Sequence, residues 1–125
     1  DERADEAVCS AALGMLPRPY DAVMLGMGTD GHIASLFPQT SGLAKRLDLQ
    51  TEARCAATTA PTAPQARMTL TLATLLHSRW IGLHITGQEK WKTLESAIES
   101  QDVLSYPVLA LLKQRQVPVH VYWSP

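Results

Sequence analysis

The feature that most constrains the fold is a short apolar run that ends in a glycine-rich loop. The run spans Ala22 to Leu25, and the loop from Gly26 to Gly31 follows it directly. A short, continuously apolar run is typical of a strand buried in a parallel sheet, and glycines let the chain turn sharply at its end. Open α/β sheets bind ligands at the carboxyl ends of their strands. The sequence therefore predicts a buried strand with a binding loop at its tip.

Helical and strand-like patterns alternate around this strand. Apolar residues recur at helical spacing over residues 5–16, 72–79, 88–100 and 107–113, and one helical turn is predicted over 32–37. Strands are predicted over 22–25, 80–86 and 117–123, with weaker patterns at 56–59 and 67–71. This alternation indicates an α/β fold, in which a layered, parallel-rich sheet has helices on both faces and residues 1–125 form a single domain.

Composition excludes several classes of protein. The chain has 125 residues, of which 46% are hydrophobic and 18% charged, as expected for a globular domain with a core. Its formal net charge is -1 without a basic stripe, so nucleic acid is not an expected partner. No apolar stretch approaches the roughly 20 residues of a membrane span, and the start lacks the pattern of a signal peptide. We therefore expect a soluble, cytoplasmic protein.

The cysteines and histidines do not predict a metal site. Cys9 and Cys55 are far apart in sequence, and each lies among alanines where a small hydrophobic residue would serve. The histidines lack the close spacing to Cys, His or Glu that zinc motifs show; they are His32, His77, His84 and His120. We expect neither a metal nor a cofactor, and only structural roles for all but the first histidine.

The glycine loop can be interpreted in three ways. Residues 26–31 spell G-x-G-x-x-G after a strand, as in dinucleotide-binding sites. Such sites also need an acidic residue at the end of a second buried strand, but the residues around Asp48 and Glu52 have no buried-strand pattern. In a structural interpretation, the glycines make a turn and Asp30 caps a following helix. In the third, Asp30 and His32 perform acid/base chemistry, since histidine as a residue type titrates near neutrality. The position of the loop at the tip of a strand favours the third.

A resemblance supports that choice. The segment reads Gly26-Met27-Gly28-Thr29-Asp30-Gly31-His32-Ile33-Ala34-Ser35-Leu36-Phe37-Pro38. It resembles the signature of 6-phosphogluconolactonases and, more distantly, the loop of glucosamine-6-phosphate deaminases. Residues 67–71, 86–90 and 106–108 resemble later lactonase segments in the same order. Family members normally begin with a strand and a Ser-Gly-Gly-Ser-Thr type loop, which is absent here. The resemblance implies a NagB/RpiA-like sugar-phosphate fold that lacks its N-terminal strands, and thus the carboxyl-terminal half of such a protein.

One position distinguishes the two activities. In the deaminases, the residue seven positions after the loop Asp is a Glu that assists proton transfer, whereas here it is Phe37. A phenyl ring cannot exchange protons, so the resemblance implies hydrolysis of 6-phospho-D-glucono-1,5-lactone to 6-phosphogluconate, in the pentose phosphate pathway, over deamination or isomerisation. A sugar-phosphate-binding domain without catalysis is the alternative, because the upstream phosphate loop is missing.

We infer a mechanism centred on His32. The imidazole would take a proton from the attacking water and return it to the ring oxygen, while Asp30 orients it. Amides of the loop glycines Gly26, Gly28 and Gly31 would bind the substrate and its developing oxyanion.

Two cations are expected to bind the phosphate. They are Arg67, whose guanidinium suits a phosphate bidentately, and Lys90, which is predicted in the first turn of a helix. Ser35 is not expected to act as a nucleophile, because it lacks the G-x-S-x-G elbow. The lactone is thus the one small-molecule partner that we predict.

Overall fold

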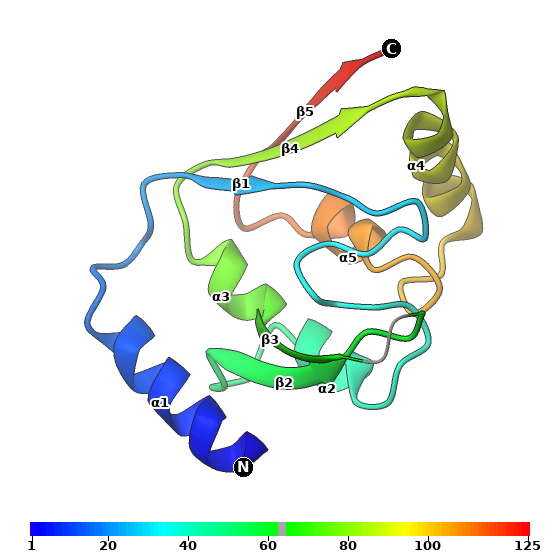
Figure 1. The fold of residues 1–125 in the computed structure, drawn as a ribbon. Helices are drawn as coiled ribbons and strands as arrows, with labels where there is room; N and C mark the ends of the chain where they lie inside the picture. Colours follow the sequence, from blue (N-terminus) through cyan, green and yellow to red (C-terminus); the bar gives the residue numbers. More distant parts are fainter. Residues whose placement is uncertain (63–64) are drawn as a thin grey trace.

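A three-stranded parallel sheet forms the centre of the computed structural model, which describes residues 1–62 and 65–125 (Figure 1). Its strands, in spatial order, are β1 (Val23–Leu25), β4 (Ile81–Thr86) and β5 (Val119–Ser124). Val23 pairs with Ile81, which in turn pairs with Val119. The glycine loop directly follows β1, so it leaves the sheet at the carboxyl-terminal end of a strand, as the sequence predicts. The burial expected for this strand is not found, because β1 lies at the edge of the described sheet and Met24 is 59% exposed.

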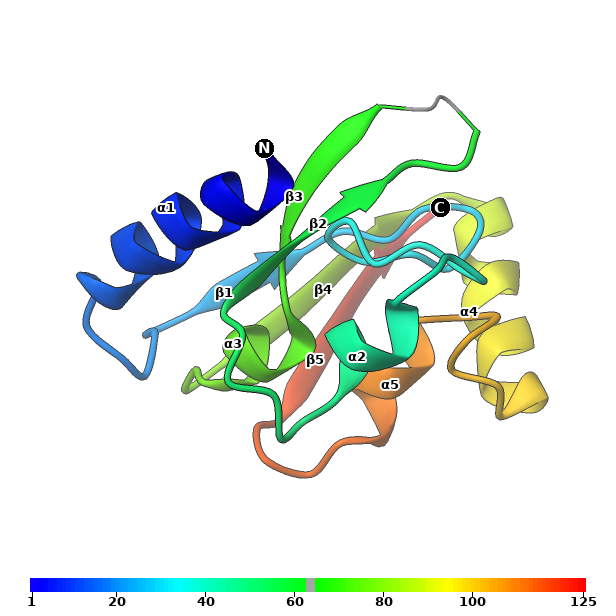
Figure 2. The same cartoon turned by 90° about the horizontal axis from the view of Figure 1, so that it is seen from below.

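A two-stranded antiparallel ribbon and five helices complete the described part of the chain. The ribbon pairs β2 (Cys55–Thr59) with β3 (Ala66–Leu70). The helices are α1 (Glu2–Gly14), α2 (Leu43–Leu47), α3 (Leu72–Leu76), α4 (Gln88–Ser100) and α5 (Val108–Lys113). In Figure 2, α2, α3, α5 and the ribbon all lie in front of the sheet, so they cover the same face. None of the helices in residues 1–62 and 65–125 is long and apolar enough to cross a membrane.

The core lies between the central strand and these helices. Ile81, Leu83 and Ile85 of β4 are each at most 1% exposed. They share one face of the strand because side chains alternate along it. From the other side come the apolar residues of α3 and α5, including Leu75 and Leu111. Burial of this face explains why β4 is apolar at every second position.

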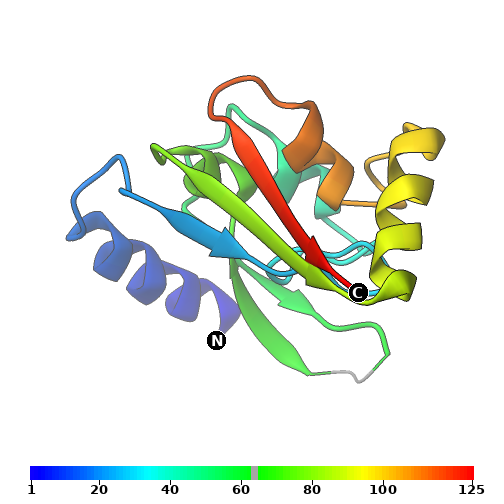
Figure 3. The ribbon, with the colours of Figure 1, turned by 90° about the horizontal axis from the view of Figure 1, so that it is seen from above.

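The opposite face of the sheet is open in the described structure. Figure 3 views the three strands with no helix in front of them. Met24 of β1 is 59% exposed and Tyr122 of β5 is 49% exposed, and His84 and His120 are also exposed. The predicted α/β fold with a parallel-rich sheet is confirmed, but the second layer of helices that we expected is not among the described residues.

Two local predictions need correction, and one helix was not predicted. Residues 32–37 form no helical turn: Ile33 and Leu36 make an isolated antiparallel bridge around a turn in which Ala34 has a φ of 49°. Asp30 therefore caps no helix. The helix predicted over 72–79 ends at Leu76. Helix α2 was not predicted, because five residues that bury only Leu43 and Leu47 are too short to show a helical period.

Candidate active site

The glycine loop brings Asp30 and His32 into direct contact. Asp30 Oδ1 lies 2.5 Å from His32 Nδ1 and also accepts the backbone N–H of His32 at 3.0 Å. In a neutral imidazole, a hydrogen bond to an ionised carboxylate requires the ring proton on Nδ1, which leaves the Nε2 lone pair available. The side chain of Asp30 is 43% exposed and that of His32 is 32% exposed. An imidazole that is oriented and exposed in this way can accept a proton at Nε2.

Two of the loop glycines are required by close packing. A Cβ at Gly28 would overlap His32 Cε1 and would lie 2.8 Å from Asp30 Oδ1. Gly31 has a φ of 86°, and a Cβ there would lie 2.9 Å from Tyr106 Cδ1. Gly26 is different, since nothing lies within 4 Å of the position of its Cβ. The sequence pattern thus combines two glycines needed for geometry with one that leaves space open.

The loop is held from outside by two helical segments. Thr93 Oγ1 of α4 donates a hydrogen bond of 2.8 Å to the carbonyl oxygen of Thr29. Val108 N, at the start of α5, donates to the carbonyl oxygen of Gly31 at 3.0 Å. Sequence reasoning identified neither contact, because a threonine on a helix carries no signal for a partner so distant in the chain. Both contacts restrict the positions that the His32 imidazole can take.

An aromatic ring completes the surroundings of the imidazole. Phe37 is 7% exposed, and its ring centroid lies 4.9 Å from that of His32. A buried phenyl ring offers no proton and no charge to the imidazole. The position at which the deaminases have a glutamate is therefore occupied by an apolar contact, as we inferred from the sequence.

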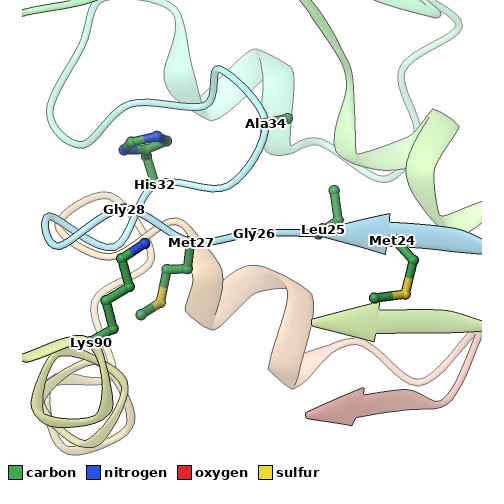
Figure 4. Close-up of a pocket in the computed structure, with 8 residues that line it drawn as sticks. All are labelled: Met24, Leu25, Gly26, Met27, Gly28, His32, Ala34 and Lys90. Carbon is green, nitrogen blue, oxygen red and sulfur yellow. The ribbon is translucent and has the colours of Figure 1, made fainter. Parts of the chain in front are cut away.

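His32 faces a cavity of about 550 Å³ that Lys90 enters from the other side. The lining residues are Met24, Leu25, Gly26, Met27, Gly28, His32, Ala34 and Lys90 (Figure 4). Lys90 lies in the first turn of α4, and no carboxylate among the described residues pairs with it. The structure thus gathers His32, Lys90 and two of the three predicted glycines around one space, with Asp30 bonded to the imidazole.

Arg67 does not line this cavity. It lies exposed on β3, opposite Thr58 of β2, and its Nη2 donates to Gln65 Oε1 at 3.2 Å. Two residues along the same face of the strand, Thr69 Oγ1 accepts the backbone N–H of Ser35 at 3.1 Å. That face of β3 thus contacts the segment that follows the glycine loop, while the guanidinium itself stays outside the cavity lining.

The loop amides are not all available to a substrate. Gly28 N already donates to the carbonyl oxygen of His32 at 2.9 Å, and Gly31 N donates to that of Gly28 at 3.0 Å. These two bonds fix the loop, so neither amide suits the oxyanion-binding role that we expected for it. The amides of Gly26 and Met27 have no acceptor within the part of the chain that the structure describes. Both residues line the cavity.

A family model and curated proteins match this chain. The model, described as glucosamine-6-phosphate isomerases/6-phosphogluconolactonase, matches residues 2–123. A 6-phosphogluconolactonase of Pseudomonas putida is 39% identical in an alignment of 126 positions that covers 99% of this chain and 50% of the relative. One of Pseudomonas aeruginosa is 42% identical over 110 residues, which are 88% of this chain and 45% of the relative. The chain spans about half the length of the curated relatives it matches, which fits a carboxyl-terminal part of such a protein.

Solved structures match the fold. The crystal structure of a 6-phosphogluconolactonase from Shewanella baltica superposes with a TM-score of 0.91 at 43% identity, covering 98% of this chain and 52% of that one. A monomeric glucosamine-6-phosphate deaminase superposes with a TM-score of 0.61 at 24% identity, covering 95% and 50%. The second likeness is one of fold alone.

Proposed function

The chain belongs to the family of glucosamine-6-phosphate isomerases and 6-phosphogluconolactonases, and we propose that it carries the hydrolytic site of a 6-phosphogluconolactonase. The substrate is 6-phospho-D-glucono-1,5-lactone and the product 6-phosphogluconate. The observation that carries the proposal is the Asp30–His32 pair at a cavity that Lys90 also lines. We further propose that residues 1–125 form one α/β domain within a larger lactonase domain, and that the protein acts in the pentose phosphate pathway in the cytoplasm.

Hydrolysis proceeds through one imidazole. The neutral His32 ring accepts a proton at Nε2 from a water molecule as the water oxygen bonds to the lactone carbonyl carbon. The bond between that carbon and the ring oxygen then breaks, and the proton on Nε2 passes to the leaving ring oxygen. Asp30 stabilises the imidazolium that exists between the two steps, because its carboxylate is bonded to Nδ1. No covalent intermediate is needed.

We assign stabilisation of the oxyanion to backbone amides in the first part of the glycine loop. Gly26 and Met27 line the cavity, and their amides donate to no acceptor among the described residues. Donors fixed in advance stabilise a developing negative charge without reorganising, which is a large term in acyl transfer. The glycine at position 26 also leaves space for the close approach of the substrate.

Lys90 is assigned to the phosphate. A cation in the first turn of a helix is disfavoured by the helix dipole, and a bound anion reverses that sign. Lys90 shares its cavity with the imidazole, so a sugar phosphate can contact both residues. Arg67 is the second candidate for a phosphate contact. It lies on the face of β3 that contacts Ser35, just after the glycine loop. Its place outside the cavity lining makes it the weaker contact.

The test is lactone hydrolysis above the spontaneous rate. Formation of 6-phosphogluconate is followed through a coupled dehydrogenase for the 125-residue chain and for any longer natural protein that contains it. Activity that disappears in His32→Asn supports the proposal. Tight binding of 6-phosphogluconate without catalysis in either protein would instead support the alternative of a sugar-phosphate-binding domain. Release of ammonia from glucosamine 6-phosphate would contradict the hydrolytic assignment.

A further inference from the structure

Helix α1 lies against strand β2 through the Cys55 thiol. Cys55 is 3% exposed, and its Sγ lies 3.3 Å from Ser10 Oγ and 3.4 Å from the carbonyl oxygen of Glu6. Residues three and four apart on a helix share one face, so Glu6, Cys9 and Ser10 present the same side to the strand. Cys9 is half-buried on the same side, and in sequence it lies between the two residues whose atoms contact Cys55 Sγ. The fold thus pairs two cysteines that the sequence places far apart.

Two hydrogen bonds fix this contact on either side of Cys55. Glu6 Oε1 accepts the backbone N–H of Ala57 at 2.7 Å. Arg54 Nη1 donates to the carbonyl oxygen of Ser10 at 3.3 Å. Both bonds join the turn of α1 that carries Cys9 to the residues that flank Cys55. These bonds therefore hold the turn of α1 that carries Cys9 in a fixed register beside Cys55.

We propose that Cys9 and Cys55 form a reversible disulfide that ties α1 to β2. The oxidant is a small disulfide such as oxidised glutathione. The Cys9 thiolate attacks one sulfur of the small disulfide, which releases one thiol and leaves a mixed disulfide on Cys9. The Cys55 thiolate then attacks the Cys9 sulfur and releases the second thiol. Two electrons pass from the protein thiols to the oxidant, and the two protein protons end on the released thiols.

Cys9 reacts first because it is the more exposed of the two. The hydrogen bond with Cys55, together with burial, raises the pKa of Cys9 above its ordinary value. A raised pKa keeps the thiol protonated at neutral pH, so oxidation is slow there and speeds up as pH rises toward the pKa. The pair thus resists a mild oxidant at neutral pH and closes under stronger or more alkaline oxidation.

A closed disulfide would stabilise the folded segment that carries the candidate active site. The residues between the two cysteines include β1 and the loop that holds Asp30 and His32. Helix α1 buries none of its own residues, so in the reduced chain its contact with β2 depends on a few polar bonds. A covalent tie removes conformations of the unfolded chain, and it does so more for longer loops.

The experiment compares oxidation under native conditions and in urea. The reduced chain is treated with oxidised glutathione at pH 8, and tryptic peptides are mapped by mass spectrometry. We expect a Cys9–Cys55 link with a loss of about 2 Da, formed at least roughly tenfold faster in buffer than in 8 M urea, where only chain diffusion pairs the thiols. In a longer natural protein that contains the chain, we also expect the link to raise the unfolding midpoint by roughly 10 °C, and reduction to lower it again.

Matched variants separate the pair from either thiol alone. Cys9→Ser should leave Cys55 unmodified because it is buried, and Cys55→Ser should stop at the mixed disulfide on Cys9. Equal rates in buffer and urea, a persistent mixed disulfide in the unsubstituted chain, or a link only between two chains would each overturn the proposal. None of these readouts depends on lactone hydrolysis, so the test of the disulfide is independent of the proposed function.

Discussion

Thr93 on α4 donates a hydrogen bond of 2.8 Å to the carbonyl oxygen of Thr29, two residues before the end of the glycine loop. Lys90 lies one turn earlier on the same helix. The bond therefore sets the position of the proposed phosphate ligand relative to the imidazole of His32. Positioning of this kind affects the rate even when no reacting atom is touched.

The first prediction follows from that bond. Thr93→Val keeps the shape and removes the donor, so we expect kcat/KM for the phosphorylated lactone to fall by roughly tenfold, the scale of one net hydrogen bond. Thr93→Ser keeps the donor and should restore most of the rate. A Thr93→Val enzyme with unchanged kinetics and unchanged stability would show that the contact positions nothing.

Substitution of His32 tests the general base. His32→Asn should lower kcat by roughly 100-fold or more while KM changes little, because proton transfer is lost and binding is kept. Asp30→Asn should lower kcat in the same direction, since an amide that donates to Nδ1 would hold the imidazole in the wrong tautomer. Full activity in His32→Asn, measured against the spontaneous rate, would remove this residue from the mechanism.

The two cations should differ in their effects. Lys90→Ala should weaken binding of the phosphorylated lactone by about 1.5 to 3 kcal/mol, the value of a charge-assisted hydrogen bond. Arg67→Ala should cost less, because Arg67 lies outside the lining of the cavity. Unphosphorylated gluconolactone is the control substrate, and both variants should hydrolyse it as the parent does. Equal losses on the two substrates would indicate damage to the fold.

A pair of glycine variants tests the close packing of the loop. Gly28→Ala places a methyl group against His32 Cε1, so we expect a loss of about 1 to 3 kcal/mol in the free energy of unfolding and a large fall in kcat. Gly26→Ala meets nothing within 4 Å and should change stability by less than about 0.5 kcal/mol. Denaturant titration of a longer natural protein that contains the chain measures both changes. Similar losses in the two variants would contradict the close approach of Gly28 to the imidazole ring.

The features of the fold that the sequence predicts are those determined by residues close together in the chain. The apolar period predicts β4 and α4 nearly to their ends, and the spacing of Asp30 and His32 is enough to expect their contact. The turn at Ala34 escapes prediction because its positive φ has no glycine to signal it. Antiparallel pairing of β2 with β3 escapes it because an apolar pattern does not name the partner of a strand.

Contacts between distant residues are beyond the sequence for a different reason. The bond from Thr93 to Thr29 joins residues 64 positions apart, and either threonine alone has the pattern of a surface residue. The sequence indicates that Cys9 and Cys55 are separate core residues, which holds for the buried Cys55 but not for the half-buried Cys9. Such pairs become visible only when packing of the elements is known.

The open face of the sheet leads to the last prediction. Met24 and Tyr122 expose large apolar surface beside the stacked rings of Trp80 and His120, and one edge of β1 pairs with no other strand among residues 1–62 and 65–125. Exposed patches and edges of this kind promote association. We expect the 125-residue chain alone to bind a hydrophobic dye, to unfold with low cooperativity and to hydrolyse the lactone poorly. Cooperative unfolding with full activity would show that these residues hold the entire site.

Charged substitutions on this face decide whether another part of a protein covers it. In the chain alone, Met24→Lys should reduce dye binding and association, because it places charge on a surface that water already reaches. In a longer natural protein that contains the chain, the same change should cost about 2 kcal/mol or more of stability if the face is buried there. Val8→Lys on α1, where the side chain is 71% exposed, is the matched control and should be neutral in the chain alone. A longer protein that tolerates Met24→Lys equally well would show that this face stays open to solvent.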